Sequence, residues 1–247
     1  MKTFKLTLEY DGTDFNGWQL QANARRTVQG ELEKALSKIF KKDRIPCIGS
    51  GRTDSGVHAR GQVAHFRVDT DMPPEELMRA LNHNIPRDVV VVDAKLVAAK
   101  FHAQLSARSK IYSYTILNRP YASALERNRC CYFPRKLNIR LMREEARAYV
   151  GKMDFSSFAN VDRSRTCDAV RTIKRFQVTK SGDVIRIVVE ADGFLYKMVR
   201  NMVGTLLEVA SGRFPPGSIK KMLNDRDRRA AGLAAVAQGL CLEQVKY

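Results

Sequence analysis

Long apolar runs are missing from this sequence of 247 residues. No run approaches the roughly 18 apolar residues that a membrane-spanning helix requires, so the sequence offers no candidate membrane span. Residues 1–12, MKTFKLTLEYDG, alternate as in a β-strand and lack the apolar core of a signal peptide. We therefore expect a cytoplasmic protein.

Paired cysteine motifs are also missing. The cysteines are odd in number and include no C-x-x-C pair, which argues against a disulfide framework and a zinc ribbon. His58 and His65, with Cys47 as a third ligand, match no compact zinc spacing, and Asp54 is the only acidic residue nearby. We therefore expect no metal site. The cysteines are Cys47, Cys130, Cys131, Cys167 and Cys241.

Acidic residues are scarce relative to basic ones. Lys and Arg total 43 against 26 Asp and Glu, which gives a formal net charge of +17 and a pI near 9.9. An excess of this size favours a polyanionic partner, above all nucleic acid, although a highly charged surface alone would also produce it. The hydrophobic content of 44% indicates a globular chain, and the length suits one or two domains.

The stretch with the most chemistry is residues 49–66, GSGRTDSGVHARGQVAHF. A glycine-rich loop carries Asp54 toward the alternating run at residues 61–68, which is typical of a strand. Arg52 lies two residues earlier, and a cation beside a carboxylate keeps it ionised. Such an Asp can act as a nucleophile or base, but the same residues also suit a simple turn in which Asp54 bonds nearby backbone N–H groups.

Hydrophobic spacing predicts a mixture of helices and strands, hence an α+β fold with a mixed or antiparallel sheet. Thr27 is the expected N-cap of the first helix, and Trp18 is expected in the core. Residues 118–139 and 151–160 are expected to be irregular or turn-like. The predicted strands are 4–10, 61–68, 88–96, 107–117, 172–179, 184–190 and 240–245, and the predicted helices are 27–39, 73–83, 141–150, 194–212 and 215–223.

Six segments carry a family resemblance: RTDSGVHA, EYDGTDFNGWQ, TVQGELEKAL, FHAQLSARSKIYSYTI, DFSSFAN and FLYKMVRNMVG. Together they resemble the TruA family of tRNA pseudouridine synthases, and RTDSGVHA resembles the active-site motif of that family. The resemblance covers nearly the whole chain. It implies the pseudouridine synthase fold, with two ferredoxin- or RRM-like halves that share an extended sheet, helices on one side, a central active-site cleft and a homodimer. We expect the halves at residues 1–105 and 106–247.

The same resemblance implies that Asp54 is the nucleophile and that Tyr112 and Arg200 are active-site residues. Physical reasoning assigns their roles: Tyr112 would stack on the base or relay a proton, and Arg200 would pair with Asp54. Arg52, beside the nucleophile, would occupy the gap left by an extruded nucleotide or hold a phosphate. The implied reaction converts uridine to pseudouridine at positions 38–40 of the tRNA anticodon stem-loop, and it requires no metal or organic cofactor. Taken singly, Tyr112 could be an ordinary sheet residue, and Arg52 and Arg200 could be solvated charges.

Two other functions fit parts of the sequence. A nonenzymatic RNA-binding protein would share the basic surface but would not need Asp54, Tyr112 and Arg200 together. A zinc-dependent base deaminase requires H-x-E and P-C-x-x-C motifs, and neither occurs. Phosphate contacts are expected to position tRNA on a basic face. The candidate contacts are Arg25, Arg26, Arg60, Arg108, Lys110, Arg163, Arg165 and Arg171.

Overall fold

The structure is a computed structural model that describes residues 1–21, 26–160 and 168–247. By its internal contacts the chain divides into two compact units. Unit 1 comprises residues 1–108 and 241–247, and unit 2 comprises residues 109–240. Four residues named above, Arg25, Arg163, Arg165 and Cys167, lie outside the described residues.

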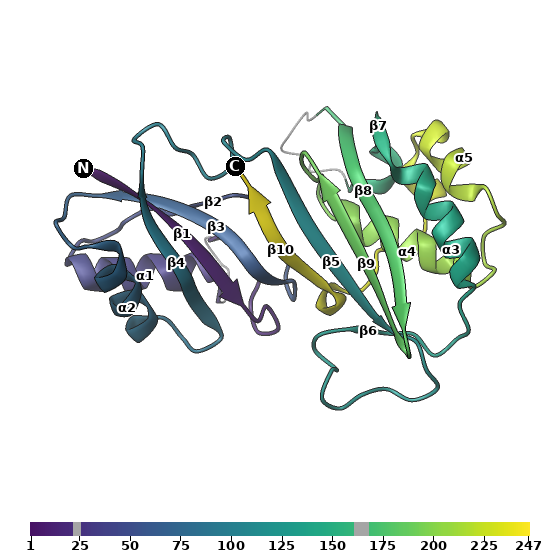
Figure 1. The fold of residues 1–247 in the computed structure, drawn as a ribbon, viewed down its shortest axis with the longest axis horizontal. Helices are drawn as coiled ribbons and strands as arrows, with labels where there is room; N and C mark the ends of the chain where they lie inside the picture. The colour runs from purple at the N-terminus through teal and green to yellow at the C-terminus, as the bar shows by residue number, and fades with distance from the viewer. Residues whose placement is uncertain (22–25, 161–167) are drawn as a thin grey trace. The chain divides into compact units, whose positions relative to one another are not determined.

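Unit 1 is an α+β unit whose strands are ordered β4-β1-β3-β10, with β2 beside β3 (Figure 1). The pairs β1–β3, β1–β4 and β2–β3 are antiparallel, whereas β10 runs parallel to β3. Helices α1 and α2 pack together, and α2 packs against β4. The elements are β1 (Lys2–Tyr10), α1 (Val28–Phe40), β2 (Ile48–Gly49), β3 (His58–Val68), α2 (Pro74–Asn84), β4 (Val89–Val97) and β10 (Leu240–Lys246).

Period-two alternation in β1 builds the core of unit 1. Phe4, Leu6, Leu8 and Tyr10 point to one face and are all buried, as the alternation predicts. Trp18 is buried as expected. These predictions about the core are confirmed.

Helix α1 begins where its capping residue predicts. The Thr27 hydroxyl oxygen accepts a hydrogen bond from the Gly30 N–H at 3.2 Å. Such a cap satisfies one of the N–H groups that a helix leaves without a partner in its first turn. The predicted N-cap is therefore confirmed.

Unit 2 is also α+β, with strands ordered β5-β9-β8-β7 in antiparallel pairs and β6 parallel to β5. In Figure 1 its three α-helices gather on one side of the sheet. The elements are β5 (Ser109–Leu117), β6 (Cys131–Tyr132), α3 (Ile139–Ala146), η1 (Arg147–Tyr149), β7 (Gly151–Asp154), η2 (Ser156–Phe158), β8 (Val170–Ser181), β9 (Val184–Ala191), α4 (Met198–Ala210), α5 (Ser218–Asp225), η3 (Arg228–Ala230) and η4 (Ala237–Gly239).

The α+β prediction and the hairpin of β8 and β9 are confirmed. The stretch at 118–139 is largely irregular as expected, apart from the two residues of β6. The prediction for residues 151–160 is wrong, because they contain β7 and η2 rather than a simple turn. The sequence did not predict β2, β6 or β7, because these strands are too short to show a recognisable alternation.

The observed units differ from the halves expected at residues 1–105 and 106–247. The first boundary follows residue 108, and residues 241–247 belong to unit 1. The reason is the pairing of Cys241 and Leu242 with His58 and Ala59 of β3. No helix within the described residues is both long and apolar enough to cross a membrane.

Candidate active site

The loop that carries Asp54 is held on its own strand by a small buried network. The Ser50 N–H donates to the Val63 carbonyl at 2.7 Å, and the Ser50 hydroxyl donates to Gln62 Oε1 at 2.7 Å. Gln62 Nε2 in turn donates to the carbonyl of Gly51 at 3.0 Å. Ser50 and Gln62 are both fully buried, so this network fixes the start of the loop.

The end of the loop is a tight turn just before β3. The Val57 N–H donates to the Asp54 carbonyl at 3.2 Å, and Gly56 adopts a φ of 77°. A φ in that range favours glycine. The Asp54 side chain is half-buried. The sequence correctly predicted a glycine-shaped loop that presents Asp54 at the start of a strand.

A second loop, residues 11–18, packs along the Asp54 loop. The Trp18 N–H donates to the Thr53 carbonyl at 3.1 Å, and the Ser55 hydroxyl donates to the Phe15 carbonyl at 3.1 Å. Gly17 has a φ of 82°, and a Cβ there would overlap the Thr53 carbonyl oxygen. The two loops therefore approach backbone to backbone, which restricts how far Asp54 can shift.

Tyr10 secures the same loop from the sheet. Its hydroxyl lies 2.8 Å from Thr53 Oγ1, and both side chains are buried. Burial raises the pKa of Tyr10 well above its ordinary value, so the hydroxyl stays neutral. Thr53, which precedes Asp54, is thus fixed twice: its carbonyl bonds the Trp18 N–H, and its hydroxyl bonds Tyr10.

Arg52 is exposed and contacts Gln19. Its Nε donates to Gln19 Oε1 at 3.3 Å. Gln19 also donates through Nε2 to Gln29 of α1 at 2.8 Å. Arg52 is therefore linked to the start of α1 by a chain of two glutamines.

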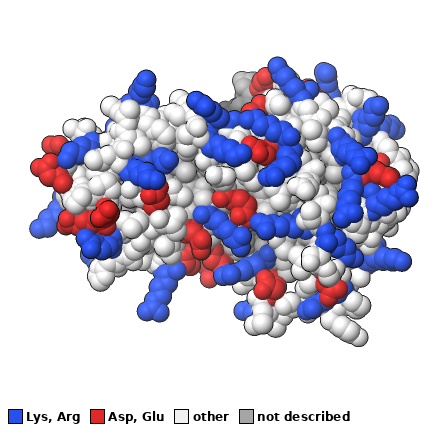
Figure 2. Space-filling model, in the orientation of Figure 1, with Lys and Arg blue, Asp and Glu red and all other residues white. Residues whose placement is uncertain are grey.

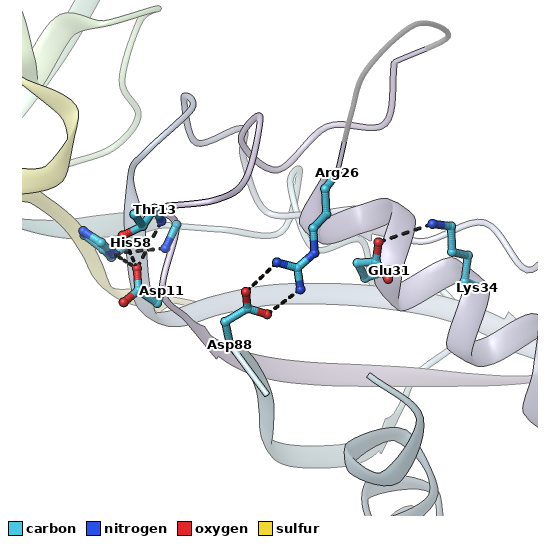
Figure 3. Close-up of polar contacts among 8 residues, drawn as sticks. Asp11, Thr13, Arg26, Glu31, Lys34, His58 and Asp88 are labelled. Atoms are coloured by element: carbon cyan, nitrogen blue, oxygen red, sulfur yellow. Dashed lines mark hydrogen bonds and ion pairs between the residues drawn. The ribbon is translucent and has the colours of Figure 1, made fainter. Parts of the chain in front are cut away.

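His58 and Asp11 form a polar cluster at the start of β3 (Figure 3). The Gly12 N–H donates to His58 Nδ1 at 3.0 Å, and Asp11 Oδ1 lies 3.2 Å from the same nitrogen. Thr13 donates to Asp11 Oδ1 through its hydroxyl at 2.6 Å. His58 is thus engaged in shaping the second loop.

The other two residues considered as metal ligands lie in the core. His65 Nδ1 accepts from the Ala103 N–H at 3.1 Å, and burial lowers the pKa of His65 below its ordinary value. Burial also raises the pKa of the Cys47 thiol, which disfavours the thiolate that a metal needs. Among the described residues, no group of three or more His, Cys, Asp or Glu could hold a metal ion.

Tyr112 lies in β5 of unit 2, opposite Val189 of β9. Its ring meets that of Phe194 edge to face, with centroids 5.1 Å apart. Only 8% of Tyr112 is exposed. The contact with Phe194 helps to fix the orientation of the largely buried Tyr112 ring.

Arg200 lies in the first turn of α4. Its Nε donates to the Ala235 carbonyl at 2.7 Å, and its own carbonyl accepts from the Ala235 N–H at 2.9 Å. The side chain is half-buried. Ala235 therefore fixes both the main chain and the side chain of Arg200. The sequence did not indicate this contact, because Ala235 contributes only backbone atoms to it.

The candidate RNA-contacting residues differ in how they are engaged. Arg26 pairs with Asp88 through two bonds of 2.6 and 2.7 Å, and Arg60 lies 3.6 Å from Glu243. Burial lowers the pKa of Lys110. Arg171 donates to the carbonyls of residues 168 and 170, and Arg108 is exposed. Figure 2 shows Lys and Arg spread widely over the face in view, with fewer Asp and Glu.

Unit 1 thus holds Arg52 and Asp54 in one loop, and unit 2 holds Tyr112 in β5 and Arg200 in α4. The sequence missed the residues that support them, namely Tyr10, Gln19 and Ala235. Tyr10 carried a usable signal, since a tyrosine at the buried end of a strand normally requires a partner for its hydroxyl. Gln19 and Ala235 carried none that local spacing could reveal.

Comparison with known proteins gives a consistent result. Residues 7–104 and 146–247 match the family model described as tRNA pseudouridine synthase. The chain is 42% identical, over 100% of both chains, to tRNA pseudouridine synthase A 2 of Clostridium perfringens. It is 43% identical to tRNA pseudouridine synthase A of Bacillus subtilis over 98% of both chains.

Among solved structures, a match covers 96% of this chain and 57% of a chain in the crystal structure of a Cbf5-Nop10-Gar1 complex. The sequence identity is 11% and the TM-score is 0.37. A likeness this low supports no argument about fold or function.

Proposed function

Because the chain belongs to the tRNA pseudouridine synthase family, we propose that it isomerises uridine to pseudouridine in the anticodon stem-loop of tRNA. The observation that carries this proposal is the full-length similarity to synthases of the A type, together with the intact RTDSGVHA segment around Asp54. The matched ranges of the family model include Asp54 and Arg200, whereas Tyr112 lies between them.

The reaction breaks the bond between base and sugar, turns the base and rejoins it through carbon. It adds no atom and changes no oxidation state, so its needs are a nucleophile, proton transfer and a pocket for the detached base. We assign the nucleophile to Asp54. The support is its position in a loop held at both ends, since a nucleophile must be kept close to its attacking position.

Tyr112 and Arg200 serve the same uridine in this proposal. Tyr112 stacks on the base, and its edge-to-face contact with Phe194 keeps the ring in one orientation. Arg200 is assigned to pair with Asp54, as the family resemblance implies, and its bond to Ala235 limits its motion. Arg52 is assigned to the RNA, either to a phosphate or to the gap left by the extruded nucleotide.

Three further features belong to the proposal. The functional halves are residues 1–105, which supply Asp54, and residues 106–247, which supply Tyr112 and Arg200. The protein acts as a homodimer in the cytoplasm, where its tRNA substrate occurs. Net positive charge of +17 supports binding to the tRNA backbone, with affinity that falls as salt increases.

The test is incubation of the purified protein with unmodified tRNA transcript and no cofactor, followed by chemical mapping of pseudouridine. We expect product in the anticodon arm. Asp54→Asn should bind tRNA as before and form no product, while Asp43→Asn, an exposed aspartate of the same unit, should act as the matched control with wild-type turnover. Turnover near the wild-type rate in Asp54→Asn would refute the nucleophile assignment.

Two controls separate the alternatives. Tight tRNA binding without product would indicate an RNA-binding protein, and binding that hardly changes with salt would contradict the basic-surface contacts. A chelator should leave the activity unchanged. An activity that is lost on chelation and restored by zinc would revive the metal-dependent alternative.

A further inference from the structure

The orientation of Arg200 depends on a segment that carries no charged or catalytic side chain. We call residues 232–239, GLAAVAQG, the Arg200 strap. Ala235 of this strap bonds Arg200 twice, accepting from Nε at 2.7 Å and donating its N–H to the Arg200 carbonyl at 2.9 Å. Of the five N–H groups of the guanidinium, the one on Nε is therefore used to fix the plane of the group.

Close packing fixes the strap against α4. A Cβ at Gly204 would overlap the carbonyl oxygen of Leu233, so the strap crosses the helix where a side chain is lacking. The Gly232 N–H donates to Thr205 Oγ1 at 3.0 Å. The strap therefore lies directly on the helix that carries Arg200.

Tyr114 of β5 also holds the strap in place. Its hydroxyl donates to the Val236 carbonyl at 2.8 Å, immediately after Ala235. Gly239 leaves room for the ring, since a Cβ there would come within 2.6 Å of the Tyr114 ring carbon that bears the hydroxyl. Tyr114 itself is fully buried.

The hydroxyl of Tyr114 is a permanent donor. Burial raises its pKa well above the ordinary value, and the nearby positive charge of Arg200 acts in the opposite direction but does not prevail. The neutral hydroxyl thus keeps its bond to Val236 over the whole physiological pH range.

We propose that Tyr114 is a positioning residue for the isomerisation: through Val236 and Ala235 it sets the orientation of the Arg200 guanidinium. The inference rests on the proposed function, because it concerns the residue assigned to pair with Asp54. The Tyr114 hydroxyl bonds the strap at Val236, next to the residue that holds Arg200, so we expect its effect on the reaction to act through Arg200. A small displacement of a catalytic group is enough to slow a reaction by orders of magnitude.

The decisive variant is Tyr114→Phe, which removes the hydroxyl and keeps the ring. Tyr149→Phe is the matched control, because Tyr149 is equally buried and its hydroxyl donates at 3.1 Å to the carbonyl of Met202, which also lies in α4. Both variants lose one buried hydrogen bond, so both should lower the melting temperature by a similar amount. Of the two tyrosine hydroxyls, that of Tyr114 bonds the strap and that of Tyr149 bonds α4.

The readout is the single-turnover rate of pseudouridine formation with excess enzyme, together with the Kd for tRNA. We expect Tyr114→Phe to lower the rate about tenfold with an unchanged Kd, and Tyr149→Phe to stay within about twofold of wild type. The variants are then repeated in an Arg200→Lys background, where no Nε–H remains to be oriented. There, Tyr114→Phe should change the rate by less than about twofold, because two residues that act as one unit are not additive.

Two outcomes overturn the proposal while wild-type protein is active. One is an equal loss of rate from Tyr114→Phe in both backgrounds, which would make its role independent of Arg200. The other is a rate within about twofold of wild type despite a lowered melting temperature, which would make the bond merely structural. A wild-type protein that forms no pseudouridine would instead refute the proposed function, and the role of Tyr114 with it.

Discussion

The ion pair between Arg26 and Asp88 gives a prediction whose size follows from its geometry (Figure 3). Arg26 Nη1 and Nη2 each donate to one carboxylate oxygen of Asp88, at 2.6 and 2.7 Å. The side chains are 32% and 29% exposed, and the bonds to Asp88 raise the pKa of Arg26. Exposed pairs contribute roughly 0.2–1 kcal/mol, whereas hydrogen bonds to charged groups contribute about 1.5–3 kcal/mol when buried. A partly buried bidentate pair should therefore couple by about 1–2 kcal/mol.

The pair also joins segments that flank the Asp54 loop. The Arg26 carbonyl accepts from the Asn16 N–H at 2.9 Å, and the Asp88 carbonyl accepts from the Asp11 N–H at 3.0 Å. The Arg26 guanidinium lies 4.3 Å from the centre of the Phe15 ring. Asp88→Asn leaves that cation–π contact in place, so its effect isolates the carboxylate. We expect Asp88→Asn to lower the melting temperature by about 3–6 °C.

The assay is a double-mutant cycle in urea with Arg26→Gln, Asp88→Asn and the double variant. A second cycle on Lys2 and Asp71 serves as the control, because that pair has a similar bond length of 3.0 Å but side chains that are 43% and 106% exposed. Its coupling should stay below about 0.5 kcal/mol. Equal coupling energies for the two pairs would refute the reasoning, since burial and bidentate geometry would then not strengthen an ion pair.

Three further predictions concern stability. Gly204→Ala should destabilise the protein by about 3 kcal/mol, as seen by chemical unfolding, because its Cβ would overlap the Leu233 carbonyl; a loss below about 0.5 kcal/mol would mean that the strap yields easily. Thr27→Ala should cost about 1 kcal/mol by loss of the cap on Gly30, and Thr27→Ser should restore most of it. Burial lowers the pKa of His65 from its ordinary value of 6.5. Below that pH the histidine is therefore protonated more readily in the unfolded chain than in the folded chain. Unfolding free energy should thus fall as the pH drops from about 6.5, by at most about 1.4 kcal/mol per pH unit from this residue. His65→Asn should show a shallower fall than wild type, and identical pH profiles would contradict the assignment.

Local patterns predicted what local forces determine. The alternation in residues 4–10 identified β1 and its buried face, and Thr27 identified the start of α1, because strand pleating and helix capping depend on residues a few positions apart. The Asp54 loop was predicted for a different reason: its glycines and the RTDSGVHA motif form one contiguous segment of the sequence.

Contacts between distant segments escaped prediction. Nothing near Arg200 indicates that Ala235 binds it, because the contact uses backbone atoms and any residue supplies those. The sequence around Arg26 does not indicate its partner either, since Asp88 lies far along the chain and many other acidic residues could pair with Arg26. Such contacts are set by the fold as a whole, and a single sequence read by spacing alone does not contain them in recognisable form.

The parallel pairing of β10 with β3 has a consequence for the order of synthesis. Residues 1–108 leave the ribosome before unit 2, residues 109–240, and β10 follows only after both. The N-terminal sheet must therefore wait, with the side of β3 that receives β10 uncovered, while an entire second unit is made. Gly61 of β3 leaves room for β10 to approach, because a Cβ at this position would lie 2.5 Å from the Glu243 carbonyl oxygen. A chain built this way completes the unit that contains Asp54 last, and pairing between segments so far apart in sequence is a slow step in folding.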